Sequence, residues 1–132
     1  HTIRQLAKDD EVWRQTLRGL NEEFYHSTVT TKEIEEYISM SIGIDLSKVF
    51  DQYLRDYRVP IFEYEIDDGE LQYRWNSVID GFDMPIEVII DGENKILNPS
   101  GEFKKTKIKN LYINVDNDYY VYTKDLKIVT NN

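Results

Sequence analysis

The sequence predicts an α+β protein in which an N-terminal segment of about three to four helices is followed by a small antiparallel β-sandwich of the immunoglobulin-like type. Two observations lead to this prediction: apolar residues recur at helical spacing before Pro60 and at every second position after it. A hydrophobic content of 40% over 132 residues also suffices for a packed core. We therefore assign residues 1–60 to a helical segment and residues 61–132 to a β-sandwich domain.

The first two helices are indicated by apolar residues on one side of each. Ile3 and Leu6 fit the last turns of one helix. Asp9 or Asp10 is a suitable N-cap for the next helix, with acidic side chains in its first turn. The apolar stripe of this second helix follows at i, i+4, i+7 and i+11 and consists of Trp13, Leu17, Leu20 and Phe24.

Two further helices carry clearer signals at their ends. Thr30 and Glu33 match a capping box, and Gly43 is placed to end the helix that they begin. Asp45 is expected to cap the following helix, and Pro60 stops any continuation of it. The apolar stripe of that helix is formed by Leu46, Val49, Phe50, Tyr53 and Leu54.

The segment after Pro60 alternates apolar and polar residues, which is the pattern of half-buried strands. Turn sequences at 67–69, 91–92, 98–101 and 116–118 separate the alternating runs. Six to eight short strands with frequent turns are typical of an antiparallel sandwich. We expect the strands at 62–66, 71–75, 86–90, 96–97, 103–108, 111–115, 119–123 and 126–129.

Charge and composition exclude several classes of partner. The net charge is −9, and a surface this acidic repels phosphate backbones, so we expect no nucleic-acid partner. Without cysteine, neither a disulfide nor a thiolate metal site can form, which fits a cytoplasmic and an extracytoplasmic protein equally well. No apolar run reaches about 18 residues, so no membrane-spanning segment is expected. The basic run fits an exposed edge strand and consists of Lys104, Lys105, Lys107 and Lys109.

The residue inventory predicts no catalytic, cofactor-binding or metal-binding residue in this chain. His1 and His26 are its only histidines, and it contains no H-E-x-x-H motif, whereas a catalytic zinc usually takes three protein ligands. We interpret His26 as a cation near the negative end of a helix dipole, because it lies just past a predicted helix. Ser27 adjoins His26, but no G-x-S-x-G turn is present to expose a nucleophile.

Carboxylates are plentiful, yet none is arranged in a diagnostic way. Glu63 and Glu65 fall on one face of a predicted strand, at a spacing that resembles a glycosidase carboxylate pair. We interpret them as solvated residues on the wet side of that strand. The acidic runs at 67–68 and 116–118 lack the full spacing of a calcium-binding loop, so we interpret them as turns.

A series of short motifs appears in order between residues 3 and 60. The motifs are Leu17-Arg18, Phe24-Tyr25, Thr30-Thr31 with Glu33, Gly43-Ile44-Asp45-Leu46, Phe50-Asp51-Gln52-Tyr53-Leu54, and Pro60. Their order resembles the stretch after the active site in zinc aminopeptidases of the aminopeptidase N and leukotriene hydrolase type, which are gluzincin metallopeptidases. Three positions depart from the family pattern: Tyr53 stands where tryptophan is usual, Ile42 replaces a serine-glycine approach, and Arg58-Val59 replace a frequent glycine.

The resemblance implies that this chain is a non-catalytic C-terminal fragment of a peptidase. The parent would cleave N-terminal residues from peptides with a zinc-activated water. Its zinc ligands, general base and catalytic tyrosine would all precede His1, so zinc is expected in the parent and no cofactor in this chain. The helices would complete one wall of the catalytic domain, and the β-sandwich would support it. The expected partners are the remainder of the parent peptidase and, for the parent, a peptide substrate.

Two arginines near Pro60 are open to two interpretations. Arg55 and Arg58 either form surface pairs with Asp51 or Asp56, or reach a substrate carboxylate in the parent.

Two alternatives to the fragment hypothesis follow from other features. A glycan- or protein-binding sandwich on a helical neck is suggested by Tyr119, Tyr120 and Tyr122, because exposed rings at a strand end can form a ligand platform. A structural interaction domain is the third hypothesis. A segment that covers a larger body should expose an apolar face by itself, so we expect self-association or an adhesive helical surface.

Overall fold

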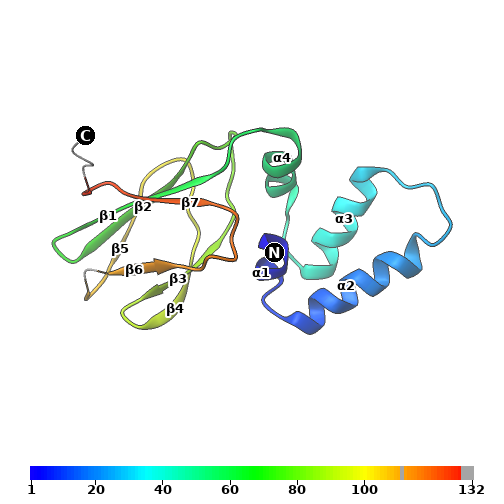
Figure 1. The fold of residues 1–132 in the computed structure, drawn as a ribbon, viewed down its shortest axis with the longest axis horizontal. Helices are drawn as coiled ribbons and strands as arrows, with labels where there is room; N and C mark the ends of the chain where they lie inside the picture. Colours follow the sequence, from blue (N-terminus) through cyan, green and yellow to red (C-terminus); the bar gives the residue numbers. More distant parts are fainter. Residues whose placement is uncertain (111, 129–132) are drawn as a thin grey trace.

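The computed structural model describes residues 1–110 and 112–128, and within them four helices precede two β-sheets (Figure 1). This confirms the α+β class and the small β-sandwich. The helices are α1 (Thr2–Ala7), α2 (Asp10–Glu23), α3 (Thr31–Ile42) and α4 (Ser47–Arg55). The strands are β1 (Ile61–Asp67), β2 (Glu70–Asn76), β3 (Ile86–Ile90), β4 (Glu93–Leu97), β5 (Lys104–Lys107), β6 (Ile113–Val115) and β7 (Tyr122–Asp125).

The helix ends follow the local signals in the sequence. The Asp9 side chain accepts from the Glu11 amide at the start of α2. Thr30 and Glu33 form the complete capping box of α3, and Gly43 ends that helix in the left-handed conformation, with φ of 73°. Asp45 accepts from the Ser47 amide at 2.9 Å, so it satisfies the first turn of α4 from one position before the N-cap residue.

The strands form one sheet in the order β5-β2-β1-β7 and a second in the order β4-β3-β6. All pairings are antiparallel except that of β7, which runs parallel to β1 with Ile61 opposite Tyr122. Because a two-residue hairpin cannot join parallel neighbours, β7 reaches β1 only after the chain has built the whole second sheet.

The strand predicted at 119–123 is wrong at its beginning. The chain still turns at Tyr119, whose amide donates to the Asp116 carbonyl and whose side chain is buried, so β7 begins only at Tyr122. Residues 126–128, predicted as a last strand, form no strand, and Val129 lies outside the described residues. The short strand predicted at 96–97 is the end of the longer β4.

The core of the sandwich lies between the two sheets and is centred on Trp75. Its ring meets Phe62 and Phe82 edge-on, with centroids 5.6 and 5.5 Å apart, and its Nε1 donates to the Met84 carbonyl at 2.9 Å. The alternating residues of the strands complete this core, namely Leu71, Tyr73, Ile86, Val88, Ile90, Leu97, Ile113 and Val115.

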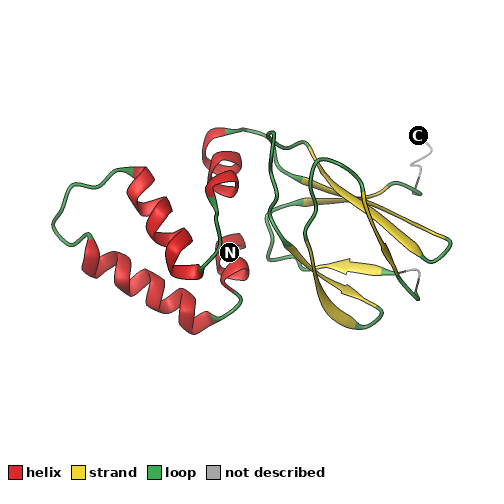
Figure 2. Cartoon of the chain, turned by 180° about the vertical axis from the view of Figure 1, so that it is seen from behind, coloured by secondary structure: helices red, strands yellow, loops and turns green. Residues whose placement is uncertain are grey.

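The four helices divide into two pairs. Helices α1 and α4 lie next to the sandwich, whereas α2 and α3 form a hairpin that extends away from it (Figures 1 and 2). Gly19 allows the two helices of the hairpin to approach closely, because the Tyr37 hydroxyl occupies the space that a Cβ would need. No helix among the residues that the structure describes is long and apolar enough to cross a membrane.

Candidate functional site

Hydrogen bonds of a buried side-chain amide connect the helices to the sandwich. Gln52 of α4 is fully buried, and its Nε2 donates to the Arg58 carbonyl at 2.9 Å. Its Oε1 accepts from the Ile79 amide at 2.7 Å, in the loop between β2 and β3. One side chain therefore satisfies two backbone groups that belong to different parts of the fold.

A second set of hydrogen bonds joins the helices to the loop before β7. Tyr53 of α4 donates to the Tyr120 carbonyl at 2.8 Å, and the Tyr120 amide donates to the Thr2 hydroxyl of α1 at 2.9 Å. Burial raises the pKa of the Tyr53 phenol above its usual value. Gln5 adds a bond of 2.7 Å to the Asp118 carboxylate. These contacts make α1 and α4 an anchor on the sandwich.

The α2–α3 hairpin, in contrast, leaves apolar surface uncovered. Trp13, Leu20 and Phe24 of the α2 stripe are only half-buried, and Leu17 is 47% exposed. The one fully buried residue of α2 is polar: Thr16, whose hydroxyl bonds the Val12 carbonyl. Trp13 and Leu20 nevertheless pack against the buried core, and the Phe24 ring meets Tyr37 of α3 edge-on, so Leu17 is the residue of the stripe that stays exposed.

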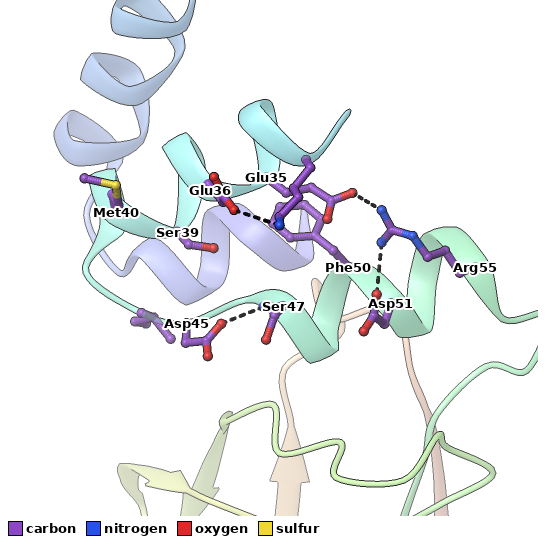
Figure 3. A pocket seen from close by; sticks show the side chains of 11 residues that line it. Glu35, Glu36, Ser39, Met40, Asp45, Ser47, Phe50, Asp51 and Arg55 are labelled. Atoms are coloured by element: carbon purple, nitrogen blue, oxygen red, sulfur yellow. Dashed lines mark hydrogen bonds and ion pairs between the residues drawn. The ribbon is translucent and has the colours of Figure 1, made fainter. Parts of the chain in front are cut away.

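A groove of about 650 Å³ lies between α3 and α4 (Figure 3). Phe50 and Ile44 provide apolar lining, and Met40, which is 82% exposed, lies at its edge. Below, this cavity is called the α3–α4 groove. Its lining consists of Lys32, Glu35, Glu36, Ser39, Met40, Ile44, Asp45, Ser47, Phe50, Asp51 and Arg55.

Arg55 joins the two helices at one end of this groove. Its guanidinium lies 2.6 Å from Glu35 of α3 and 3.1 Å from Asp51 of α4, as Figure 3 shows. Arg58 pairs with Asp56 at 2.9 Å, and its hydrogen bonds hold the pKa of the Asp56 carboxyl at about 2. The surface-pair interpretation of both arginines is therefore confirmed.

Both histidines are exposed on the surface. His1 is the exposed N-cap residue of α1, and His26 lies in the turn after α2, with φ of 53° and its ring edge-on to Tyr25. Ser27 is exposed beside it. Within residues 1–110 and 112–128, no group of three or more His, Cys, Asp or Glu side chains is arranged to hold a metal ion.

The interpretation of Glu63 as a solvated residue is wrong. Only 3% of its side chain is exposed, because Arg74 and Asn76 of β2 and Lys124 of β7 enclose it on the outer face of the sheet. The Arg74 guanidinium also lies 4.4 Å from the centroid of the Phe103 ring. The carboxylate contacts three donor side chains, those of Arg74, Asn76 and Lys124, so it is unsuited to transfer a proton to a glycosidic oxygen.

The predicted tyrosine platform is reduced to two rings. Tyr119 is 6% exposed, and its hydroxyl accepts from the Glu87 amide at 3.3 Å. Tyr120 and Tyr122 are exposed, but Tyr120 lies beside Tyr53 at the junction between helices and sandwich. The lysines of β5 lie on an exposed sheet edge, as the sequence predicted.

Sequence reasoning missed two features of these surfaces. Gln52 was visible as a polar residue within the apolar stripe of α4, three positions after Val49, and a polar residue at such a position often satisfies buried backbone groups. The α3–α4 groove had no comparable signal, because its shape depends on how two helices cross.

Comparison with known proteins does not assign the site. No protein-family model matches the chain, and no curated protein matches it.

Proposed function

We propose that this chain is a non-catalytic part of a zinc aminopeptidase, in which the helices complete the wall of the catalytic domain and the β-sandwich supports them. The parent would remove N-terminal residues from peptides. The proposal combines the motif order between residues 3 and 60 with one structural observation, which is that the apolar stripe of α2 is only partly buried and leaves Leu17 exposed.

The division of the helices into two pairs supports this assignment of roles. Helices α1 and α4 are held to the sandwich by Gln52, Tyr53 and Thr2, so that part is complete in itself. The hairpin of α2 and α3 is held to α4 by the Arg55–Glu35 pair and by the hydrogen bond from the Leu46 amide to the Ser39 hydroxyl, and its stripe stays partly exposed at Leu17. A rigid support that carries a half-covered hairpin fits a unit built to lie against a larger body.

Zinc enters this proposal only through the parent. The described residues do not fit a zinc site, since they offer no cluster of three suitable ligands. We therefore derive no catalytic step from this chain, and the metal ligands belong to the remainder of the peptidase.

The coding sequence upstream of His1 provides the direct test of the proposed family. We expect it to encode an H-E-x-x-H motif, followed by a further glutamate that completes the zinc site. The purified parent should then lose aminopeptidase activity on chelation and regain it with zinc. An upstream sequence that lacks the motif would remove the basis of the proposal.

The 132-residue chain by itself is expected to self-associate through the α2 stripe. Leu17→Glu places a charge on that stripe and should shift the chain toward monomer in sedimentation velocity experiments, because it interrupts the apolar contact. Gln15→Glu makes the same change in charge at an exposed site on the same helix and should leave association unchanged. A wild-type chain that is monomeric at every concentration and binds no hydrophobic dye would contradict this prediction.

A further inference from the structure

The α3–α4 groove combines an apolar interior with an acidic edge. Phe50 and Ile44 line its interior, and Met40 projects at its margin with most of its side chain exposed. A volume of about 650 Å³ lies within the range of cavities that enclose large side chains or small ligands. Methionine is flexible and polarizable, so Met40 can fold over an apolar group that enters.

The charges around the groove favour a cation. Four carboxylates face two cations there, which gives a formal charge of −2. Both cations already hold carboxylates: Lys32 lies 3.6 Å from Glu36, and Arg55 joins Glu35 to Asp51 (Figure 3). An entering anion would therefore meet net repulsion, whereas a lysine or arginine would be attracted.

Asp45 contributes a stable part of this negative charge. Its carboxylate accepts from the Ser47 amide, and this hydrogen bond lowers the pKa of Asp45 below its usual value. The residue is exposed at the edge of the groove, where an incoming cation can approach it.

We propose that the α3–α4 groove receives a segment of the catalytic body of the parent, which inserts an apolar side chain between α3 and α4 and places a lysine or arginine beside Glu36 and Asp45. This inference rests on the proposed function and names the chemistry of the partner surface. Helix α3 lines the groove and also packs against α2, which carries the exposed Leu17. If Met40 becomes protected from oxidation in the 132-residue chain alone as its concentration rises, a second copy of this chain is the occupant and the inference is overturned.

Methionine oxidation by dilute hydrogen peroxide tests this inference directly. The chain contains two methionines, and Met40 is 82% exposed whereas Met84 is fully buried. Mass spectrometry can follow both residues in the full-length parent and in the 132-residue chain at concentrations where it is monomeric. Because oxidation follows exposure, Met40 should react rapidly in the chain alone. It should react about tenfold more slowly in the parent if the occupied groove opens for about a tenth of the time.

Variants of the parent show whether the protection of Met40 depends on charge or only on a segment that covers the groove. Glu36→Lys should restore rapid oxidation of Met40, and the milder Glu36→Gln should restore part of it, because both weaken the attraction for the incoming cation. Glu22→Lys makes the same charge reversal on the exposed surface of α2, outside the groove, and should leave Met40 protected. Met84 must stay unreacted throughout, which shows that the protein remains folded.

The possible results distinguish the inference from the function on which it rests. Equal oxidation rates of Met40 in the parent and in the chain alone would overturn the inference. If Met40 stays protected in the Glu36→Lys variant of the parent, the part of the inference that places a lysine or arginine beside Glu36 is overturned. Both results leave the aminopeptidase assignment intact if the upstream zinc motif is present, and absence of that motif removes the assignment itself.

Discussion

Replacing Gln52 by leucine is expected to lower the free energy of unfolding by about 3 kcal/mol, although leucine has a similar size and is more hydrophobic. The change leaves the Ile79 amide and the Arg58 carbonyl buried without the partners that Gln52 supplies at 2.7 and 2.9 Å. Each unsatisfied buried group costs about 1–3 kcal/mol. Urea unfolding followed by circular dichroism should show a lower midpoint with an unchanged slope.

A matched substitution shows whether this effect comes from the position or from the loss of a glutamine. Gln72 is half-buried on the outer face of β2, and Gln72→Leu should change the free energy of unfolding by no more than about 0.5 kcal/mol. If Gln52→Leu were as stable as wild type, the two backbone groups would have found water or other partners. The junction between α4 and the loop after β2 would then be looser than the structure shows.

The features that sequence reasoning predicted well are those set by neighbouring residues. The capping box of Thr30 and Glu33 and the left-handed Gly43 fix both ends of α3 within a few residues of chain. The alternation in β1 and β2 similarly decides which side chains face the core, because the period of a strand is two. Local chemistry determines these elements, so a single sequence suffices to place them.

The features that it missed depend on residues far apart in the chain. The parallel pairing of β7 with β1 joins Tyr122 to Ile61, and no local pattern reports such a partner. The α3–α4 groove likewise combines residues of two helices, which Arg55 connects through Glu35 and Asp51. The candidate surfaces of this chain are formed by tertiary packing, and for that reason its sequence motifs indicated no site.

The environment of Glu63 depends on both the local strand pattern and the tertiary packing. Its replacement is the second change with a large expected effect. The alternating pattern placed it correctly on the outer face of β1, yet it is buried there by residues of β2 and β7. Glu63→Gln keeps the shape of the side chain but removes the charge that Arg74 meets at 2.8 Å and Lys124 at 3.5 Å. We expect a loss of about 2 kcal/mol at neutral pH, less than for a fully buried pair because both cations remain partly hydrated.

The pH dependence of this loss identifies its cause. Burial alone would raise the pKa of Glu63, but hydrogen bonds from Asn76 and Arg74 and the charges of Arg74 and Lys124 outweigh it, so the pKa lies below its usual value. A carboxyl of this kind stabilises the fold above its unfolded pKa, about 4.3 for glutamate, and the contribution is lost as the pH falls through the folded pKa. The wild type should therefore lose stability on acidification more steeply than Glu63→Gln, and the difference between them should close.

Glu65→Gln serves as the control for this experiment, because Glu65 lies two positions along the same face of β1 and is only half-buried. Its removal should change the free energy of unfolding by no more than about 0.5 kcal/mol at any pH. A gap between wild type and Glu63→Gln that stayed constant down to acid pH would show that the loss does not come from the charge of the carboxylate. In that case the enclosure by Arg74 and Lys124 would contribute no net electrostatic stability, and the carboxylate would serve mainly to join β1, β2 and β7 through hydrogen bonds.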